Sequence, residues 1–246
     1  MRSYGLTDKG KLRQNNQDTF VITRCSSRNC SIVALCDGMG GANAGDIASG
    51  ISVRSFVEFV NARLTSRVNK NPVIEKVLKD AVDEANDVAY EYSLFDLSLN
   101  GMGTTLVGGI ICDDGEAHIV NVGDSRAYLL SSSNVTQITT DHSFVEELVR
   151  VGAITREQAS THPQKNVITR ALGTEKTVEC DYYRLKLNDG ERLLLCSDGL
   201  SNLVSETEML SVFSKSGTPE EMCTGLLELT YQHGASDNVT IVVLEK

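Results

Sequence analysis

The stretch SIVALCDGMGGANAG, residues 31–45, begins with a run of apolar, strand-forming residues that ends at Asp37–Gly38. A second apolar run, RLLLCSDGL (192–200), ends in the same way at Asp198–Gly199. Neither pair is followed by another strand-like run; each leads into a helical one. A carboxylate at the end of a buried strand opens onto the rim of its sheet, and the glycine beside it lets a ligand approach the backbone.

Two other Asp-Gly pairs have a strand-like run on both sides. Asp114–Gly115 and Asp189–Gly190 are therefore predicted to be hairpin turns, since glycine accepts the positive φ that such turns need. Two further aspartates share the placement at strand ends: Asp124 follows HIVNVG, and Asp237 directly precedes NVTIVVLE. Four carboxylates at strand ends are a pattern that turns and caps alone explain poorly.

Carboxylates gathered at one rim repel each other unless cations lie between them. Oxygen ligands without paired histidines or cysteines favour Mg²⁺ or Mn²⁺ over zinc or copper. Two such ions, roughly 3.5–4 Å apart, would polarise a bridging water and hold a phosphoryl oxygen. The pattern thus predicts a metal centre, provided that these strand ends converge.

The amino-acid composition limits the class of protein to which the chain can belong. The chain has 246 residues, of which 41% are hydrophobic, and only three are prolines, which is typical of a globular protein with a substantial core. A net charge of −10 argues against a nucleic-acid partner and is compatible with a site that gathers cations. We expect neither a signal peptide nor a membrane span, because no apolar stretch is long enough. Seven cysteines without a CxxC pair predict reduced thiols in a cytoplasmic protein.

Strand-like and helical runs alternate without linker or repeat, which predicts one domain over residues 1–246. The strands arrive in adjacent pairs with helices between the groups, so we expect an α+β fold of antiparallel sheets covered by helices. Eight strands are predicted, at 19–25, 31–36, 103–112, 117–123, 126–132, 180–187, 192–197 and 238–245. Helices are predicted at 46–62, at 72–92 with Asn71 as cap, from the capping box Ser205-x-x-Glu208, and from Thr218-Pro-Glu-Glu221 to about Gln232.

Seven short motifs, in order along the chain, resemble those of the metal-dependent Ser/Thr protein phosphatases (PPM, type 2C) in their compact bacterial form. They are TDKGKLRQNNQD (7–18), CDGMGG (36–41), GMGTTLVGG (101–109), VGDSRAYLL (122–130), TTDHS (139–143), CSDGL (196–200) and SDNVT (236–240). Each motif alone is a weak signal, but seven in the right order form a strong one.

The resemblance implies an αββα sandwich, with two central, mostly antiparallel sheets, a metal centre at one end, and a mobile flap over about 143–175. It also implies which residues form the site. Asp37 would bridge two metal ions, the Gly38 carbonyl would bind one of them, and Asp198 and Asp237 would complete the ligands of the first. Asp18 would support the cluster directly or through water, and Asp124 matches the ligand of a third ion found in bacterial relatives.

The activity that the resemblance implies is hydrolysis of phosphoserine and phosphothreonine in proteins by direct attack of a metal-activated water. Arg13 would hold the substrate phosphate through its planar fork of donors. The implied partners are phosphoproteins, a Ser/Thr protein kinase and its substrates, and the protein is expected to act as a monomer in the cytoplasm.

Two residues depart from the family pattern. Gln17 replaces a common glutamate, so we expect weaker metal binding at one position, and Met39 replaces a histidine proposed as general acid in animal members. His142 and a metal-bound water are the alternatives for that acid. Two alternative functions also stay open: a catalytically weak phosphoprotein-binding module of the same fold, and a phosphatase for a small phosphometabolite.

Overall fold

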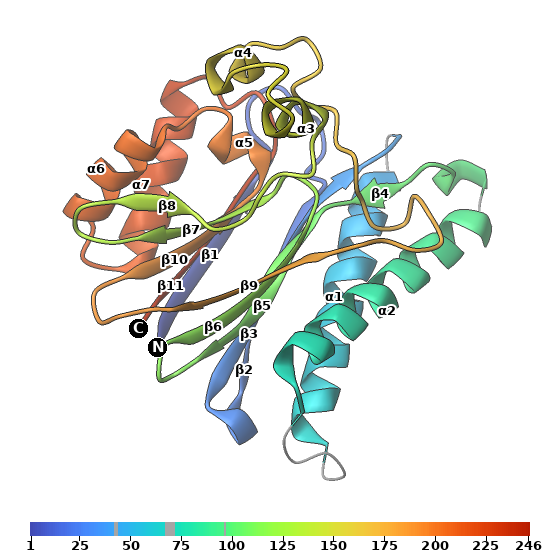
Figure 1. Cartoon of the computed structure of the whole chain (residues 1–246), viewed down its shortest axis with the longest axis horizontal. Helices are drawn as coiled ribbons and strands as arrows, with labels where there is room; N and C mark the ends of the chain where they lie inside the picture. The colour runs from blue at the N-terminus through green and yellow to red at the C-terminus, as the bar shows by residue number, and fades with distance from the viewer. Residues whose placement is uncertain (42–43, 67–71, 96) are drawn as a thin grey trace.

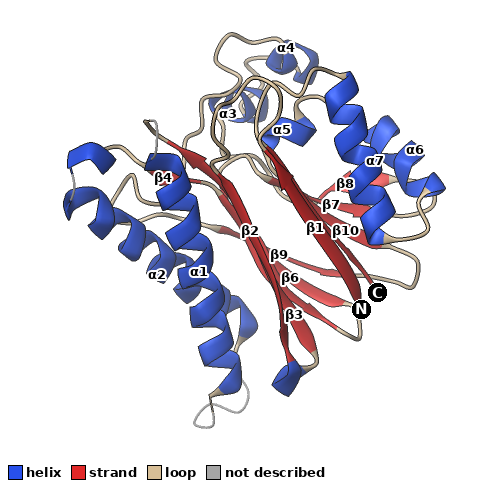
Figure 2. Ribbon diagram, turned by 180° about the vertical axis from the view of Figure 1, so that it is seen from behind, coloured by secondary structure: helices blue, strands red, loops and turns tan. Residues whose placement is uncertain are grey.

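Two antiparallel sheets lie face to face between two layers of helices in the computed structural model, which describes residues 1–41, 44–66, 72–95 and 97–246 (Figures 1 and 2). The predicted αββα sandwich is therefore confirmed. The five-stranded sheet has the order β1 (Arg2–Asp8), β11 (Val239–Glu245), β10 (Arg192–Cys196), β7 (Arg126–Leu130), β8 (Val135–Gln137). The six-stranded sheet has the order β2 (Asp18–Cys25), β3 (Cys30–Met39), β5 (Leu106–Cys112), β6 (Glu116–Val122), β9 (Asp181–Lys186), with β4 (Gly103–Thr104) paired to β3.

Side chains alternate between two apolar layers along each central strand, as the two-residue period of a strand requires. On β3, Ile32 and Ala34 face helices α1 (Ala44–Thr65) and α2 (Ile74–Phe95), while Val33 and Leu35 face the other sheet. On the five-stranded sheet, the outward side chains pack against α6 (Glu206–Lys215) and α7 (Pro219–Gln232). Burial on both faces explains why the central strands read as continuous apolar runs.

The remaining helices lie at one end of the sandwich, away from the two chain termini (Figures 1 and 2). They are α3 (Phe144–Arg150), α4 (Arg156–Ser160) and α5 (Asp198–Ser201), and two short 3₁₀ turns lie elsewhere, at Ser26–Arg28 and Leu97–Leu99. Helices α3 and α4 lie within the segment predicted as a flap, and Thr155 caps α4 through a capping box with Gln158. Among the described helices, none is both long and apolar enough to cross a membrane.

Most predicted elements are present, with differences that have physical causes. Strand β1 was not predicted, because its exposed edge position gives it no clean apolar alternation. The predicted strand at 103–112 is interrupted at Thr105, which separates β4 from β5. Helix α2 begins at Ile74, and its predicted cap, Asn71, lies outside the described residues.

One predicted hairpin is wrong. Asp114–Gly115 does join the paired strands β5 and β6. Asp189–Gly190 also makes a turn, with Gly190 at φ +83°, but it joins β9 to β10, which belong to different sheets. Turn residues specify a reversal of the chain, but the sheet that the next strand enters is decided by packing.

Candidate active site

The structure brings the predicted strand-end aspartates together at the end of the sandwich that carries α3–α5. A cavity of about 230 Å³ is lined there by Asp37, Asp124, Asp198 and Asp237, and also by Arg13 and Gly38. Asp18 lies beneath them, 5% exposed, and is the direct cross-strand partner of Asp37 in the β2–β3 pair. Because β3 and β6 belong to one sheet and β10 and β11 to the other, the cavity lies across the junction of the two sheets.

The carboxylates raise each other's pKa values. Burial raises the pKa of Asp37 well above its ordinary range, and Asp18 and Asp198 raise it further. Burial likewise raises the pKa of Asp124 to about 7, with Asp198 as the next contributor. Asp18 has a pKa raised to about 6 by burial, although hydrogen bonds from Thr240 and Ser197 oppose the rise. Such a cluster holds excess negative charge that cations would neutralise.

Three features of the cavity fit divalent metal ions. The donor set is made of carboxylate oxygens, the ligands that Mg²⁺ and Mn²⁺ prefer. Oδ1 of Asp18 is buried and has no hydrogen-bond partner among the described residues, which is costly unless a ligand or water satisfies it. At Gly38, which lines the cavity, an added Cβ would lie 2.0 Å from the backbone carbonyl oxygen of Gly45, so only glycine fits at this position of the lining.

The carboxylate groups of these aspartates do not converge on a single point. Within the described ranges, no three His, Cys, Asp or Glu side chains are arranged as a closed ligand set. Two of the carboxylates have partners of their own: Asp237 accepts a 2.7 Å bond from Arg13, and Asp198 accepts one of 3.0 Å from Asn202. The site therefore offers donors at an open rim rather than a closed cage, which suits ions that keep several waters.

Hydroxyl side chains that sequence reasoning missed hold Asp37 and Asp18 in place. The backbone N–H of Asp37 donates to Oγ1 of Thr105 at 2.9 Å, and its carbonyl accepts from Oγ1 of Thr104 at 2.8 Å. Oδ2 of Asp18 accepts from Ser197 and Thr240, both at 2.7 Å. All four residues lie in the motifs GMGTTLVGG, CSDGL and SDNVT, so the signal was present but gave no role.

Arg13 lies on a loop that is anchored by a buried asparagine. Asn238, 6% exposed, donates to the carbonyls of Lys9 and Asn15 at 3.0 and 2.9 Å. Its Oδ1 accepts from the backbone N–H of Gln17 at 2.9 Å. The bond to Asp237 raises the pKa of Arg13, so the guanidinium stays charged at the mouth of the cavity.

The two departures from the family pattern both line the cavity. Gln17 directs Nε2 to the carbonyl of Gly41 at 3.4 Å, a bond that a glutamate could not donate. Met39 lines the same cavity and offers no proton. Weaker metal binding because of Gln17 stays a prediction.

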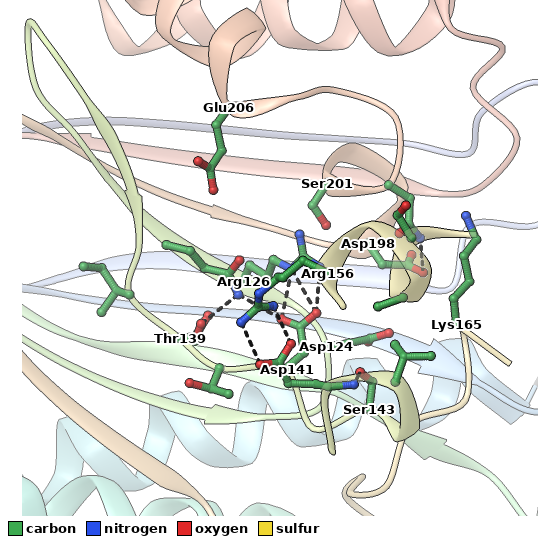
Figure 3. A pocket seen from close by; sticks show the side chains of 18 residues that line it. Asp124, Arg126, Thr139, Asp141, Ser143, Arg156, Lys165, Asp198, Ser201 and Glu206 are labelled. Carbon is green, nitrogen blue, oxygen red and sulfur yellow. Dashed lines mark hydrogen bonds and ion pairs between the residues drawn. The ribbon is translucent and has the colours of Figure 1, made fainter. Parts of the chain in front are cut away.

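A larger cavity of about 580 Å³ adjoins the first and shares Asp124 and Asp198 with it (Figure 3). Arg126 and Asp141 form a bidentate pair in its wall, with Nη2 of Arg126 2.7 Å from Asp141. Ser143, Arg156 and Lys165 reach this cavity from the predicted flap segment. A groove thus runs from the carboxylates along the flap, with room for more than a phosphate group.

Comparison with known proteins agrees with this geometry. The family model described as protein phosphatase 2C matches residues 10–226. Serine/threonine phosphatase stp of Listeria monocytogenes serotype 4b (strain F2365) is 40% identical over 243 residues, covering 98% of this chain and 94% of the relative. The crystal structure of the Mycobacterium tuberculosis serine/threonine phosphatase PstP/Ppp has a TM-score of 0.88 at 35% identity, covering 100% of this chain and 99% of that one. The PstP catalytic domain in complex with two manganese ions has a TM-score of 0.84 at 33% identity, covering 99% and 97%.

Proposed function

Because the chain belongs to the protein phosphatase 2C family, we propose that it hydrolyses phosphoserine and phosphothreonine in proteins with the help of divalent metal ions. The observation that carries the proposal is the cavity in which Arg13 meets the carboxylates of both sheets. A guanidinium beside clustered carboxylates provides a fixed cation for a phosphate and oxygen donors for metal ions in one place.

The proposed ligands are the residues that line or underlie this cavity. Asp37 would bridge two ions, either Mn²⁺ or Mg²⁺, and the Gly38 carbonyl would bind one of them. Asp198 and Asp237 would complete the ligands of the first ion, Asp18 would act directly or through water, and Asp124 would bind a third ion. Bound there, the ions would supply positive charge to the phosphoryl oxygens and lower the pKa of an attacking water.

Arg13 would bind the phosphate of the substrate. Its side chain is 54% exposed, so it can exchange the carboxylate of Asp237 for phosphoryl oxygens without leaving a buried charge unpaired. The hydrogen bonds of Asn238 to the Arg13 loop would keep this guanidinium at a fixed position relative to the carboxylates.

We also propose that the chain is one catalytic domain over residues 1–246, acts as a monomer in the cytoplasm, and opposes a Ser/Thr protein kinase on shared substrates. The groove along the flap supports a protein substrate over a small phosphometabolite, since it extends well beyond the phosphate position.

Hydrolysis of a phosphothreonine peptide with Mn²⁺, with Mg²⁺ and with chelator tests the proposal. Turnover should require added metal, should vanish with chelator, and should exceed turnover of a phosphometabolite panel. A folded protein without turnover under any of these conditions would instead support the phosphoprotein-binding module. Preference for the metabolites would refute the protein substrate.

A further inference from the structure

A buried histidine lies where the flap segment leaves the sandwich and returns to it. His142 is 6% exposed and directly precedes the flap. Its carbonyl accepts from the backbone N–H of Thr169 at 2.8 Å, which joins the outgoing and returning legs. The legs are joined again one step further along by a bond of 2.8 Å from the N–H of Phe144 to the carbonyl of Val167.

His142 is also bonded twice to Gly123, the residue before Asp124. The backbone N–H of His142 donates to the carbonyl of Gly123 at 2.9 Å. In return the N–H of Gly123 donates to Nδ1 of the imidazole at 3.1 Å. Because a backbone N–H can only donate, Nδ1 is the acceptor, and the single proton of the neutral ring is on Nε2.

The Nε2 side of the ring faces a charged pair. Nε2 lies 3.2 Å from Nη1 of Arg170 and 3.4 Å from Oδ2 of Asp181. Because a guanidinium can only donate, Asp181 is the acceptor for a proton on Nε2, and Nη1 of Arg170 also donates to the other oxygen of Asp181 at 3.2 Å. Burial and the nearby Arg170 lower the pKa of His142, which agrees with a neutral ring. A proton on Nε2 thus has Asp181 as its acceptor, and His142 is not among the described residues that line the carboxylate cavity, so the ring is not placed to be a general acid there.

Gly123 is held in a conformation that suits only glycine. Its φ is +103°, and an added Cβ would lie 2.6 Å from Cγ2 of Thr105. Its carbonyl also accepts from Nδ2 of Asn121 at 3.2 Å. Gly123 therefore has partners on both its N–H and its carbonyl, and His142 supplies a partner to each.

We infer that His142 is a positioning residue: its neutral imidazole holds the strand end that presents Asp124, while its backbone joins that strand end to both legs of the flap. The kinetic consequence rests on the proposed phosphatase function, whereas the structural link does not. Loss of the Nδ1 acceptor would leave the buried N–H of Gly123 without a partner and free the backbone before Asp124 to move.

Three variants separate the two sides of the ring. In His142→Asn, Oδ1 occupies the place of Nδ1 and keeps an acceptor for Gly123, whereas His142→Gln keeps only the Asp181 side. His118→Gln is the matched control, since His118 is also buried, at 7% exposed, and bonds through Nδ1 to Tyr182 at 2.6 Å on β6 and β9. We expect kcat/KM for a phosphothreonine peptide within about twofold of wild type for His142→Asn and His118→Gln. We expect a loss of about tenfold for His142→Gln, which corresponds to roughly 1.4 kcal/mol.

Amide hydrogen exchange of the metal-free protein provides a readout that does not need turnover. His142→Gln should speed exchange at Gly123 and along both flap legs at least about tenfold, while His142→Asn should leave it near wild type. Equal losses in His142→Asn and His142→Gln, or no loss in either, would overturn the inference. An imidazolium ring at pH 7 in the ¹⁵N spectrum of His142 would overturn it as well. If wild type shows no turnover, the proposed function fails, but the exchange result still decides whether His142 ties the flap to Gly123.

Discussion

Replacing Asp18 by asparagine should stabilise the metal-free protein at alkaline pH, although it removes a residue that we place at the metal centre. In the folded protein the pKa of Asp18 is about 6, against an ordinary value of 3.8, so the folded chain holds this proton more tightly than the unfolded chain does. The stability that the protonated carboxyl contributes is complete below about pH 4 and is lost as the pH rises through about 6. At roughly 1.36 kcal/mol per pH unit, the ionised carboxylate costs about 3 kcal/mol above that range.

About 2 kcal/mol of this cost should develop between pH 4.5 and pH 8. Asparagine carries no charge, and its carbonyl can still accept from Ser197 and Thr240 in place of Oδ2. The assay is urea unfolding of wild type and Asp18→Asn in chelator at both pH values. The variant should gain about 2 kcal/mol relative to wild type on going from pH 4.5 to pH 8, or about 5 °C in Tm for a chain of this length.

A complementary variant tests the same reasoning in the other direction. The hydroxyl of Ser197 lowers the pKa of Asp18, so Ser197→Ala should make the metal-free protein lose more stability than wild type over the same pH range. Saturating Mn²⁺ should stabilise wild type more than Asp18→Asn, because the ions favour the ionised cluster. A difference between Asp18→Asn and wild type that is the same at both pH values would refute the electrostatic argument.

Other predictions concern turnover. Asp37→Asn should abolish metal-dependent hydrolysis while circular dichroism shows an intact fold, and normal activity in this variant would refute the assignment of Asp37 as a bridging ligand. Arg13→Ala should lower kcat/KM for a phosphopeptide about 100-fold, and Mn²⁺ binding measured by calorimetry should persist; an unchanged kcat/KM would exclude Arg13 from phosphate binding. Asn238→Asp should lower kcat/KM about tenfold, because a carboxylate cannot donate to the carbonyls of Lys9 and Asn15; wild-type kinetics would show that the Arg13 loop does not depend on these bonds.

The layers of the fold were predictable from sequence because burial on both faces produces unmistakable patterns. Strands such as β3 and β11 lie between a helix layer and a second sheet, so they are buried along most of their length and largely apolar. Strand β1 escaped prediction because one edge of it is free and its side chains are only partly buried. The connection from β9 to β10 was wrongly predicted as a hairpin for a different reason: the turn at Asp189–Gly190 does not determine which sheet the next strand joins.

The aspartates of the candidate site could be predicted from sequence, because each lies at the end of a predicted strand. Asp37 and Asp198 can be recognised in the sequence because each ends an apolar run, and the structure places both in one cavity. The residues that hold the side chains of the site in place were not predicted, because threonine, serine and asparagine are common in loops and gain a role only through distant partners. Asn238, for example, contacts a loop more than 220 positions away in the chain.

The pairing of the first and last strands has a mechanical consequence. Strands β1 and β11 run antiparallel from the rung Arg2–Glu245 to the rung Asp8–Val239, so both chain ends lie at the same end of the pair. Tension applied between the two ends would open the pair like a zipper, one rung at a time, rather than shear all its hydrogen bonds together. The last rung to open adjoins the Arg13 loop and Asp237, so a pull on the ends would reach the catalytic end of the sandwich only after the whole strand had peeled away.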